Sequence, residues 1–220
     1  MNILSPSMLS ADFTILGKQL EEIKEGGAAY LHIDVMDGVF VPAISFGMCV
    51  MKSIRKASDL VFDVHLMITE PIRYVEEFKN IGADIITVHL EACEDVAATL
   101  KKIRDCGCKV GLSIKPKTPV ESLKPYLDQV DMILMMSVEP GFGGQKYIEE
   151  STERIAQVRK MIDESGFAID LEVDGGINSE NVSVVLDAGA NVIVAGSAVF
   201  GDNILNKTKE FMSILSEKEK

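Results

Sequence analysis

Tryptophan is absent from this sequence of 220 residues, and histidine occurs only three times. The four cysteines form no C-x-x-C pair, and a chain of this length does not depend on a disulfide framework, so we expect reduced thiols. Seven prolines against seventeen glycines indicate many short turns rather than Pro-rich linkers. With 47% hydrophobic and 25% charged residues, the composition is that of a globular protein and excludes a disordered or collagenous chain.

Basic residues are also few, since 22 Lys and Arg face 34 Asp and Glu, for a formal net charge of −12. This acidic balance argues against a surface that binds nucleic acid or anionic membranes. No uninterrupted apolar run reaches the roughly 18 residues of a membrane span. The first residues lack a basic segment, and Pro6 and Asp12 interrupt the apolar stretch that a signal peptide needs, so we expect a cytoplasmic protein.

Short β-rich runs alternate with amphipathic stretches of helical period along the chain. Eight strands separated by helices predict a parallel sheet, and eight units match the closure number of a TIM barrel. A doubly wound open sheet usually has fewer strands, and no break in composition divides the chain, so we predict one α/β domain, a (β/α)₈ TIM barrel, over residues 1–220. The predicted strands are Ile3–Leu9, Tyr30–Val35, Leu60–Met67, Asp84–Leu90, Lys109–Ile114, Met132–Val138, Asp170–Asp174 and Asn191–Phe200, and the helical stretches include Leu16–Glu25, Ile72–Ile81, Val96–Cys106, Val120–Leu127 and Thr152–Glu164.

All three histidines fall near the C-terminal ends of predicted strands, where TIM barrels carry their active sites. Because side chains alternate along a strand, the apolar Ile33 and Val35 face the helices, whereas His32 and Asp34 face the interior. Ionisable residues of the same parity on other strands predict a mixed nitrogen and oxygen site for a divalent ion, although each could instead be a hydrogen-bonded polar residue inside the barrel. The inward sets are His32, Asp34 and Met36, then Asp63, His65 and Met67, then Glu172, Asp174 and Gly176.

Glycine-rich segments follow three neighbouring strands near the end of the chain. Glycine lets backbone N–H groups approach an anion, and the loops after strands 7 and 8 are the common phosphate position in this fold, although turns also need glycine. Three methionines lie at strand mouths with inward parity, where they fill the core or form an apolar cap that shields a reacting carbon from water. The segments are 139–146, 175–178 and 195–197, and the methionines are Met36, Met67 and Met136.

Taken together, these residues resemble the ribulose-phosphate 3-epimerase family nearly from end to end. The motifs that carry the resemblance are S-P-S-M-L-S-A-D-F at 5–13, H-I-D-V-M-D-G at 32–38, F-V-P at 40–42, F-G at 46–47, D-V-H-L-M at 63–67, S-V-E-P-G-F-G-G-Q-K at 137–146, E-V-D-G-G-I at 172–177 and A-G-S-A-V-F at 195–200. Departures from the commoner pattern fall at Ala43, Met48, Lys115, Lys117 and Ser137, none of which is a proposed metal ligand.

The resemblance implies a (β/α)₈ barrel that interconverts D-ribulose 5-phosphate and D-xylulose 5-phosphate in the pentose phosphate pathway. It also implies one divalent metal ion (Zn²⁺, Fe²⁺, Mn²⁺ or Co²⁺), a small ketose phosphate substrate, and a homo-oligomer, either a dimer or a hexamer. By position, the metal ligands are His32, Asp34, His65 and Asp174, the acid/base pair is Asp34 and Asp174, the substrate contacts are Ser7, His65, Gly141, Phe142, Gly143, Gly144, Gly175, Gly176, Gly196 and Ser197, and the cap is Met36, Met67 and Met136.

Epimerisation at C3 removes a proton next to the C2 ketone and returns one to the opposite face, so two bases on opposite sides of a planar intermediate suit it. Asp34 and Asp174 come from strands across the barrel, and a cation would stabilise the enediolate as a Lewis acid. A cation and backbone N–H groups would also reconcile the acidic composition with an anionic substrate.

Four other functions stay open at this point. One is a 3-epimerase of another ketose phosphate, such as D-allulose 6-phosphate, and another is a Schiff-base aldolase that uses Lys115. A third is a non-catalytic sugar-phosphate binder on the same barrel. The fourth, a metal-dependent hydrolase, is disfavoured because the first strand lacks the H-x-H that such barrels use.

Overall fold

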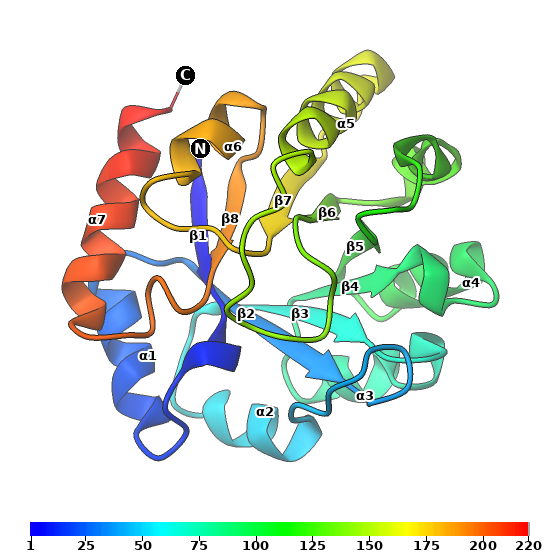
Figure 1. Cartoon of the computed structure of the whole chain (residues 1–220). Coiled ribbons are helices and arrows are strands. Elements are labelled where there is room, and N and C mark those ends of the chain that lie inside the picture. The colour runs from blue at the N-terminus through cyan, green and yellow to red at the C-terminus, as the bar shows by residue number, and fades with distance from the viewer. Residues whose placement is uncertain (220) are drawn as a thin grey trace.

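The computed structural model describes residues 1–219, in which eight parallel strands curl around a common axis with helices outside (Figure 1). The predicted TIM barrel is thereby confirmed; the predicted domain boundary, Lys220, lies outside the described residues. The strands are β1 (Ile3–Pro6), β2 (Tyr30–Met36), β3 (Val61–Met67), β4 (Ile85–His89), β5 (Lys109–Ile114), β6 (Met132–Met136), β7 (Asp170–Asp174) and β8 (Val192–Ala195).

The strand order is β1-β8-β7-β6-β5-β4-β3-β2, and every pairing is parallel. The β2–β3 ladder is the longest and runs in register from Tyr30 opposite Val61 to Met36 opposite Met67. Between β1 and β2, the described chain has a single parallel bridge, from Ser7 to His32. This bridge closes the barrel at the point where the first site residues lie.

Within residues 1–219, seven α-helices cover the outside of the barrel, and the predicted helical stretches fall on or next to elements of this layer. The stretch 120–127 differs, because Val120–Gln129 (η4) is a 3-10 helix in which Pro125 supplies no N–H for an α-helical hydrogen bond. The helices are α1 (Leu16–Glu25), α2 (Met48–Ile54), α3 (Val75–Asn80), α4 (Val96–Asp105), α5 (Ser151–Ser165), α6 (Val182–Asp187) and α7 (Ile204–Glu217), with short 3-10 turns η1 (Met8–Ser10), η2 (Pro71–Arg73) and η3 (Leu90–Ala92).

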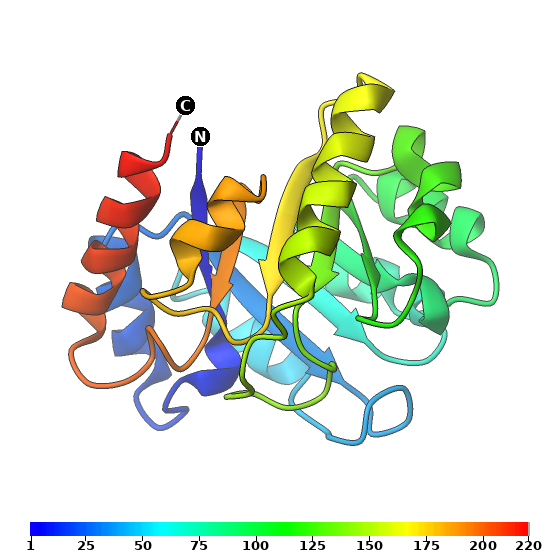
Figure 2. The same cartoon turned by 45° about the horizontal axis from the view of Figure 1, so that its top comes forward.

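Four strands, β1, β4, β6 and β8, end earlier than the sequence predicts. The two largest differences, at β1 and β8, shape the mouth of the barrel. After β1, the Ser7 hydroxyl accepts a hydrogen bond from the Leu9 N–H at 3.4 Å and begins η1. After β8, the Gly196 carbonyl accepts the N–H groups of Val199 and Phe200, so the chain turns instead of continuing the strand. Figure 2 shows the loops after β2 and β6 at this same end of the barrel.

The interior of the barrel has an apolar floor and a polar upper part. Tyr30, Ile85, Met132 and Val192, one from each even-numbered strand, form a separate apolar cluster, as expected of one layer of four side chains in such a barrel. Outside, Ile33 and Val35 belong to the main core between sheet and helices, which confirms the predicted parity of β2. The polar side chains described below are therefore held between an apolar floor and the open mouth.

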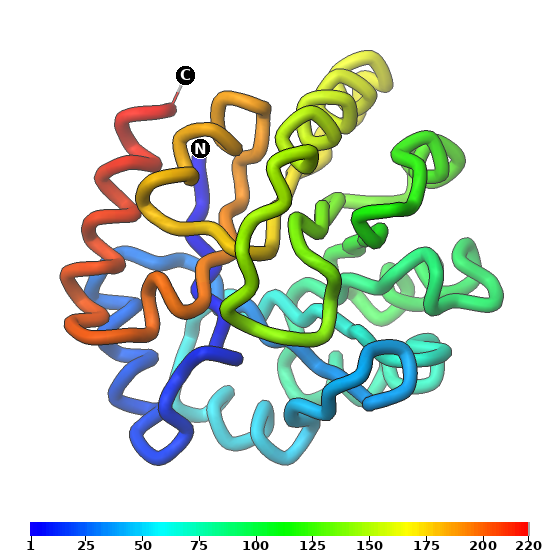
Figure 3. Tube along the Cα trace, viewed as in Figure 1, coloured from blue at the N-terminus to red at the C-terminus, as the bar shows by residue number. Residues whose placement is uncertain are grey.

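The two ends of the described chain meet beside α7, as the trace in Figure 3 shows. The Asn2 side chain donates to the Leu215 carbonyl at 2.9 Å, and the Asn2 N–H donates to Glu219 Oε1 at 3.1 Å. Within residues 1–219, no helix is both long enough and apolar enough to cross a membrane.

Candidate active site and metal centre

A pocket of about 530 Å³ opens at the C-terminal ends of the strands. Most predicted site residues line it, whereas His32 and His65 are fully buried beneath it. The predicted residues in its wall are Ser7, Asp34, Met36, Met67, Met136, Gly141, Phe142, Gly143, Gly144, Asp174, Gly175, Gly176, Gly196 and Ser197.

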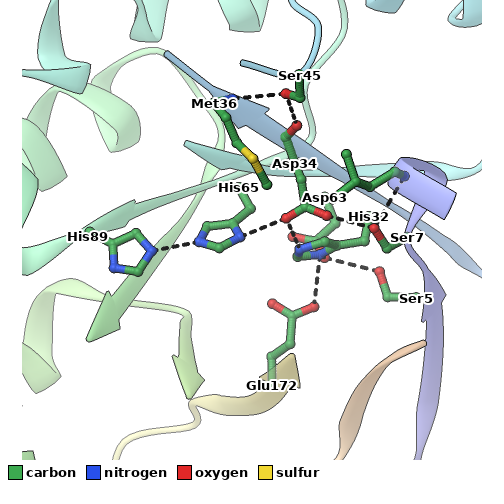
Figure 4. A network of polar contacts seen from close by, with 11 residues as sticks. Ser5, Ser7, His32, Asp34, Met36, Ser45, Asp63, His65, His89 and Glu172 are labelled. Carbon is green, nitrogen blue, oxygen red and sulfur yellow. Dashed lines mark hydrogen bonds and ion pairs between the residues drawn. The ribbon is translucent and has the colours of Figure 1, made fainter. Parts of the chain in front are cut away.

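Four of the predicted side chains, His32, Asp34, His65 and Asp174, each offer a ligand atom, and the four atoms lie within 4.8 Å of one another. Asp34 stands at the centre of the group, with Oδ1 3.0 Å from Nδ1 of His65 and 3.3 Å from Nε2 of His32. Its Oδ2 accepts a 2.6 Å hydrogen bond from the Ser7 hydroxyl, as Figure 4 shows. The structure thus brings together all four predicted ligands.

The chemistry of this cluster fits a divalent metal ion. Nε2 of His32 is fully buried and makes no hydrogen bond among the described residues, although a buried polar atom normally has a partner. Two imidazole nitrogens and two carboxylate oxygens are a donor set that suits Zn²⁺, Fe²⁺, Mn²⁺ and Co²⁺.

A second layer of polar side chains orients His32 from below. Its Nδ1 lies 2.7 Å from Asp63 Oδ2, which also accepts the Ser5 hydroxyl at 3.0 Å. Glu172 Oε1 lies 3.5 Å from the same Nδ1, and all of these side chains are fully buried. A carboxylate on Nδ1 fixes the ring and leaves Nε2 free to act as a ligand. His32, Asp63 and Glu172 also lie close enough together to hold a metal ion, but Nδ1 of His32 is already paired with Asp63 in a hydrogen bond.

His65 is supported from its other side by a third histidine. Its Nε2 lies 2.8 Å from Nε2 of His89, whose Nδ1 in turn lies 3.5 Å from Glu91 Oε2. Burial lowers the pKa of His89 to about 4, so the His89 ring is neutral at physiological pH.

The two carboxylates that face the pocket have opposite protonation behaviour. Burial acts to raise the pKa of Asp34, but the adjoining His32 and His65 outweigh it and hold this pKa below its usual range. For Asp174, burial raises the pKa to about 6, and the negative charge of Asp34 adds to the shift. Two neighbouring acids with separated pKa values are typical of an acid/base pair.

The glycines of the pocket wall have a packing reason as well as the predicted role in anion binding. A Cβ on Gly176 would lie 2.3 Å from the Tyr147 nitrogen, and one on Gly175 would lie 2.6 Å from a Val138 methyl group. Both glycines have positive φ, at 68° and 126°. The loop after β6 therefore packs directly on the backbone of the loop after β7, and a side chain at either position would separate them.

The three methionines close the apolar side of the pocket. Met36, Met67 and Met136 are at most 5% exposed, and Met36 and Met67 cluster with Val41 from the loop after β2. A hydroxyl secures the neighbouring strand end, because Ser137 donates to the carbonyls of Asp174 at 2.9 Å and Gly175 at 2.7 Å.

Several residues of the site are missing from the sequence-based set. Asp63 and Glu172 have inward parity, but parity alone does not show that they adjoin His32, because the offset between strands decides this. The third histidine, His89, belongs to the same network. Lys146, in the predicted glycine-rich loop, is the only Lys or Arg in the described wall of the pocket. Lys115 is not in that wall, and its ammonium lies 3.9 Å from the centre of the Phe40 ring.

Comparison with known proteins agrees with this geometry. The crystal structure of KGPDC from Streptococcus mutans superposes with a TM-score of 0.75 over 100% of both chains, at 12% identity, which shows the fold alone. The "Ribulose-phosphate 3-epimerase" of Bacillus subtilis (strain 168) is 47% identical over 201 residues, covering 91% of this chain and 93% of its own length. That of Escherichia coli (strain K12) is 46% identical over 199 residues, covering 90% and 88%.

The model of the Ribulose-phosphate 3 epimerase family matches residues 3–200, which hold every strand and every predicted site residue. The chain belongs to this family.

Proposed function

We propose that this protein is a metal-dependent epimerase that interconverts D-ribulose 5-phosphate and D-xylulose 5-phosphate. The observation that carries the proposal is the placement of Asp34 and Asp174 on strands from different sides of the barrel, within 4.8 Å of each other and both in the wall of one pocket. Inversion at C3 needs a base on each face of a planar intermediate, and these two carboxylates supply one from β2 and one from β7. Family membership over residues 3–200 supports the same reaction.

His32, Asp34, His65 and Asp174 would hold the metal ion. When bound, the ion would supply Lewis-acid stabilisation of the negative charge that develops on the substrate oxygens. Asp34 would take or return the C3 proton on one face, with its second oxygen oriented by the Ser7 hydroxyl. Asp174 would serve the opposite face as the second general acid/base, and in the metal-free site burial raises its pKa to about 6.

The remaining pocket residues would bind and shield the substrate. The backbones of Gly141–Gly144, Gly175, Gly176, Gly196 and Ser197 would receive the phosphate, with Lys146 as the nearby cation. The cap of Met36, Met67 and Met136 would exclude water from the reacting carbon, which strengthens the electrostatic interactions of the site. A single domain, a homo-oligomer (dimer or hexamer) and a cytoplasmic location complete the proposal.

A coupled assay tests this function. Purified protein is supplied with D-ribulose 5-phosphate, and the formation of D-xylulose 5-phosphate is measured before chelation, after chelation and after metal is restored. We expect activity that disappears with the chelator and returns with one of Zn²⁺, Fe²⁺, Mn²⁺ or Co²⁺. A parallel arm with D-allulose 6-phosphate identifies a six-carbon 3-epimerase if turnover is faster there. Binding of both sugars without exchange would overturn the proposal in favour of a non-catalytic barrel.

A further inference from the structure

We propose that His89, held by Glu91, is a positioning residue that keeps Nδ1 of His65 free of a proton and available to a divalent metal ion. The inference deepens the proposed function, since it concerns one ligand of the proposed metal centre. Neither His89 nor Glu91 lines the pocket, so the pair would act through His65 and not on the substrate.

Only one proton can lie between the Nε2 atoms of His65 and His89. Nε2 of His65 and Nε2 of His89 lie 2.8 Å apart, and both rings are fully buried. At this distance one nitrogen donates and the other accepts. If His65 donates, its proton is on Nε2, and Nδ1 has a free lone pair that points toward Asp34. If His89 donates, a neutral His65 must carry its proton on Nδ1, where it blocks a metal ion.

Glu91 decides between these two arrangements. Its carboxylate is an acceptor only, and Oε2 lies 3.5 Å from Nδ1 of His89, a buried atom that has no hydrogen-bond partner among the described residues. The negative charge of Glu91 therefore favours a proton on Nδ1 of His89, and in that tautomer Nε2 is the atom that accepts from His65. The order of donors runs from His65 through His89 to Glu91.

The carboxylate of Glu91 is fixed by the loop after β5, and its orientation is therefore not free. Its Oε1 accepts the Lys115 N–H at 2.8 Å and also the Thr118 hydroxyl. Arg154 of α5 holds this turn in place by donating to the Thr118 carbonyl at 2.7 Å. Because the Lys115 N–H is only a donor, Oε1 must remain an oxygen, and Oε2 is the atom that faces His89.

Asp34 exerts the opposite influence on His65. Its Oδ1 lies 3.0 Å from Nδ1 of His65, so without a metal ion a proton between these two atoms would be favourable. The two positions of the His65 proton, on Nε2 and on Nδ1, thus compete, and Glu91 favours Nε2, which leaves Nδ1 available to the metal ion. Removing the charge of the Glu91 carboxylate should leave the fold intact and lower the affinity for metal.

Glu91→Gln is the decisive variant. The Lys115 N–H requires the amide oxygen at the Oε1 position, so the amide NH₂ faces Nδ1 of His89 and donates to it. His89 must then carry its proton on Nε2 and donate to His65, which moves the His65 proton to Nδ1. We expect Zn²⁺ affinity, measured by chelator competition, to fall about 10- to 100-fold, the usual effect of losing a partner behind a metal ligand.

Glu70→Gln is the matched control, because Glu70 Oε1 likewise accepts a loop N–H, that of Glu94 at 2.6 Å, but contacts no histidine. We expect wild-type Zn²⁺ affinity for this variant. Turnover of Glu91→Gln should be low at limiting Zn²⁺ and return toward the wild-type value at saturation. Equal Zn²⁺ affinity of Glu91→Gln and wild type would overturn the proposal.

Nitrogen-15 NMR of the imidazole rings tests the wild type without any substitution, since the chain has only three histidines to assign. We expect His89 to be protonated on Nδ1 and not on Nε2, with the reverse in Glu91→Gln. A wild-type His89 protonated on Nε2 contradicts the proposal. If the wild type binds no metal ion, the proposed metal centre is wrong. The tautomer of His89 in that same protein still shows whether His65 donates to His89 or accepts from it.

Discussion

Asp63 and Glu172 lie against the same nitrogen of His32, at 2.7 and 3.5 Å, yet their pKa values shift in opposite directions. Burial acts to raise the pKa of both, but His32 and the Ser5 hydroxyl hold that of Asp63 below its usual value. For Glu172, burial and the charge of Asp63 together raise the pKa well above its usual value. These opposite shifts favour the negative charge on Asp63 and the proton on Glu172.

Replacement of each acid by its amide should separate these two states. Glu172→Gln exchanges one neutral group for another, so we expect the metal-free protein to change in stability by less than about 1 kcal/mol. Asp63→Asn removes the buried charge that pairs with His32, which should cost about 3–5 kcal/mol and weaken metal affinity about 10- to 100-fold. Urea unfolding and chelator competition measure both effects. The assignment is wrong if Glu172→Gln destabilises as much as Asp63→Asn.

Loss of either pocket-facing aspartate should stop proton transfer. We expect Asp34→Asn and Asp174→Asn each to lower kcat at least about 10³-fold, since each amide lacks the basic oxygen that one face requires. Asp128→Asn, an exposed aspartate of η4, is the control and should keep wild-type turnover. Near-normal kcat in either pocket variant would rule out the two-base scheme. In D₂O the wild type should place deuterium at C3, and unlabelled product would indicate an internal hydride shift instead.

Asp174 should make the metal-free protein less stable as pH rises. Its pKa is 3.8 when unperturbed and about 6 in the fold, so the unfolded chain releases this proton first. Its contribution to stability is full below pH 3.8 and falls between 3.8 and about 6, by about 2–3 kcal/mol in total. Metal-free Asp174→Asn should therefore be the more stable protein at neutral pH, with a difference that shrinks toward pH 4.

Excess metal should reverse this order of stability. A ligand that binds only the folded state stabilises it by mass action, and Asp174→Asn has lost one of the four proposed ligands. Thermal unfolding with and without Zn²⁺, at neutral and acidic pH, measures both comparisons. Identical stability curves for the two metal-free proteins across this pH range would contradict the shifted pKa of Asp174.

Gly176→Ala should damage the pocket wall through the backbone. The new Cβ would lie 2.3 Å from the Tyr147 nitrogen, at a φ of 68° that side chains rarely adopt. We expect a loss of about 1–3 kcal/mol in stability and a raised KM, because the loop that carries residues 141–144 must move away. Gly17→Ala is the control, since a Cβ there meets nothing within 4 Å and alanine favours the helix. A wild-type KM in Gly176→Ala would separate this glycine from substrate binding.

The barrel and the inward position of its four candidate ligands could be predicted because both depend on periodic patterns, and the family resemblance singled out these four among the inward residues. Alternation of strands and helices gives the fold, and a two-residue parity on β2, β3 and β7 directs His32, His65 and Asp174 inward. The methionine positions follow from the same parity, as their place in the pocket wall confirms.

The residues that hydrogen-bond to the ligand histidines could not be predicted, because these contacts depend on the offset between strands and on the orientation of single rings. Whether Asp63 meets His32 or Asp34 is set by the register of β2 against β3. Which nitrogen of His65 faces Asp34, and which faces His89, is a matter of ring rotation that no sequence period encodes. The ends of β1 and β8 likewise depend on local hydrogen bonds of Ser7 and Gly196.

The contacts that close the barrel between β1 and β2 involve residues of the proposed metal site. Among the described residues, only the Ser7–His32 bridge pairs these strands, whereas the β2–β3 ladder continues through seven residue pairs. Two side-chain hydrogen bonds add to this bridge, one from the Ser7 hydroxyl to Asp34 and one from the Ser5 hydroxyl to Asp63. The acceptors are the carboxylate that would ligate the ion and the one that steadies His32. The Ser7–Asp34 bond therefore links the two edge strands directly, and the Ser5–Asp63 bond links β1 to β3. An ion bound by Asp34 would thus also stabilise the closure of the barrel.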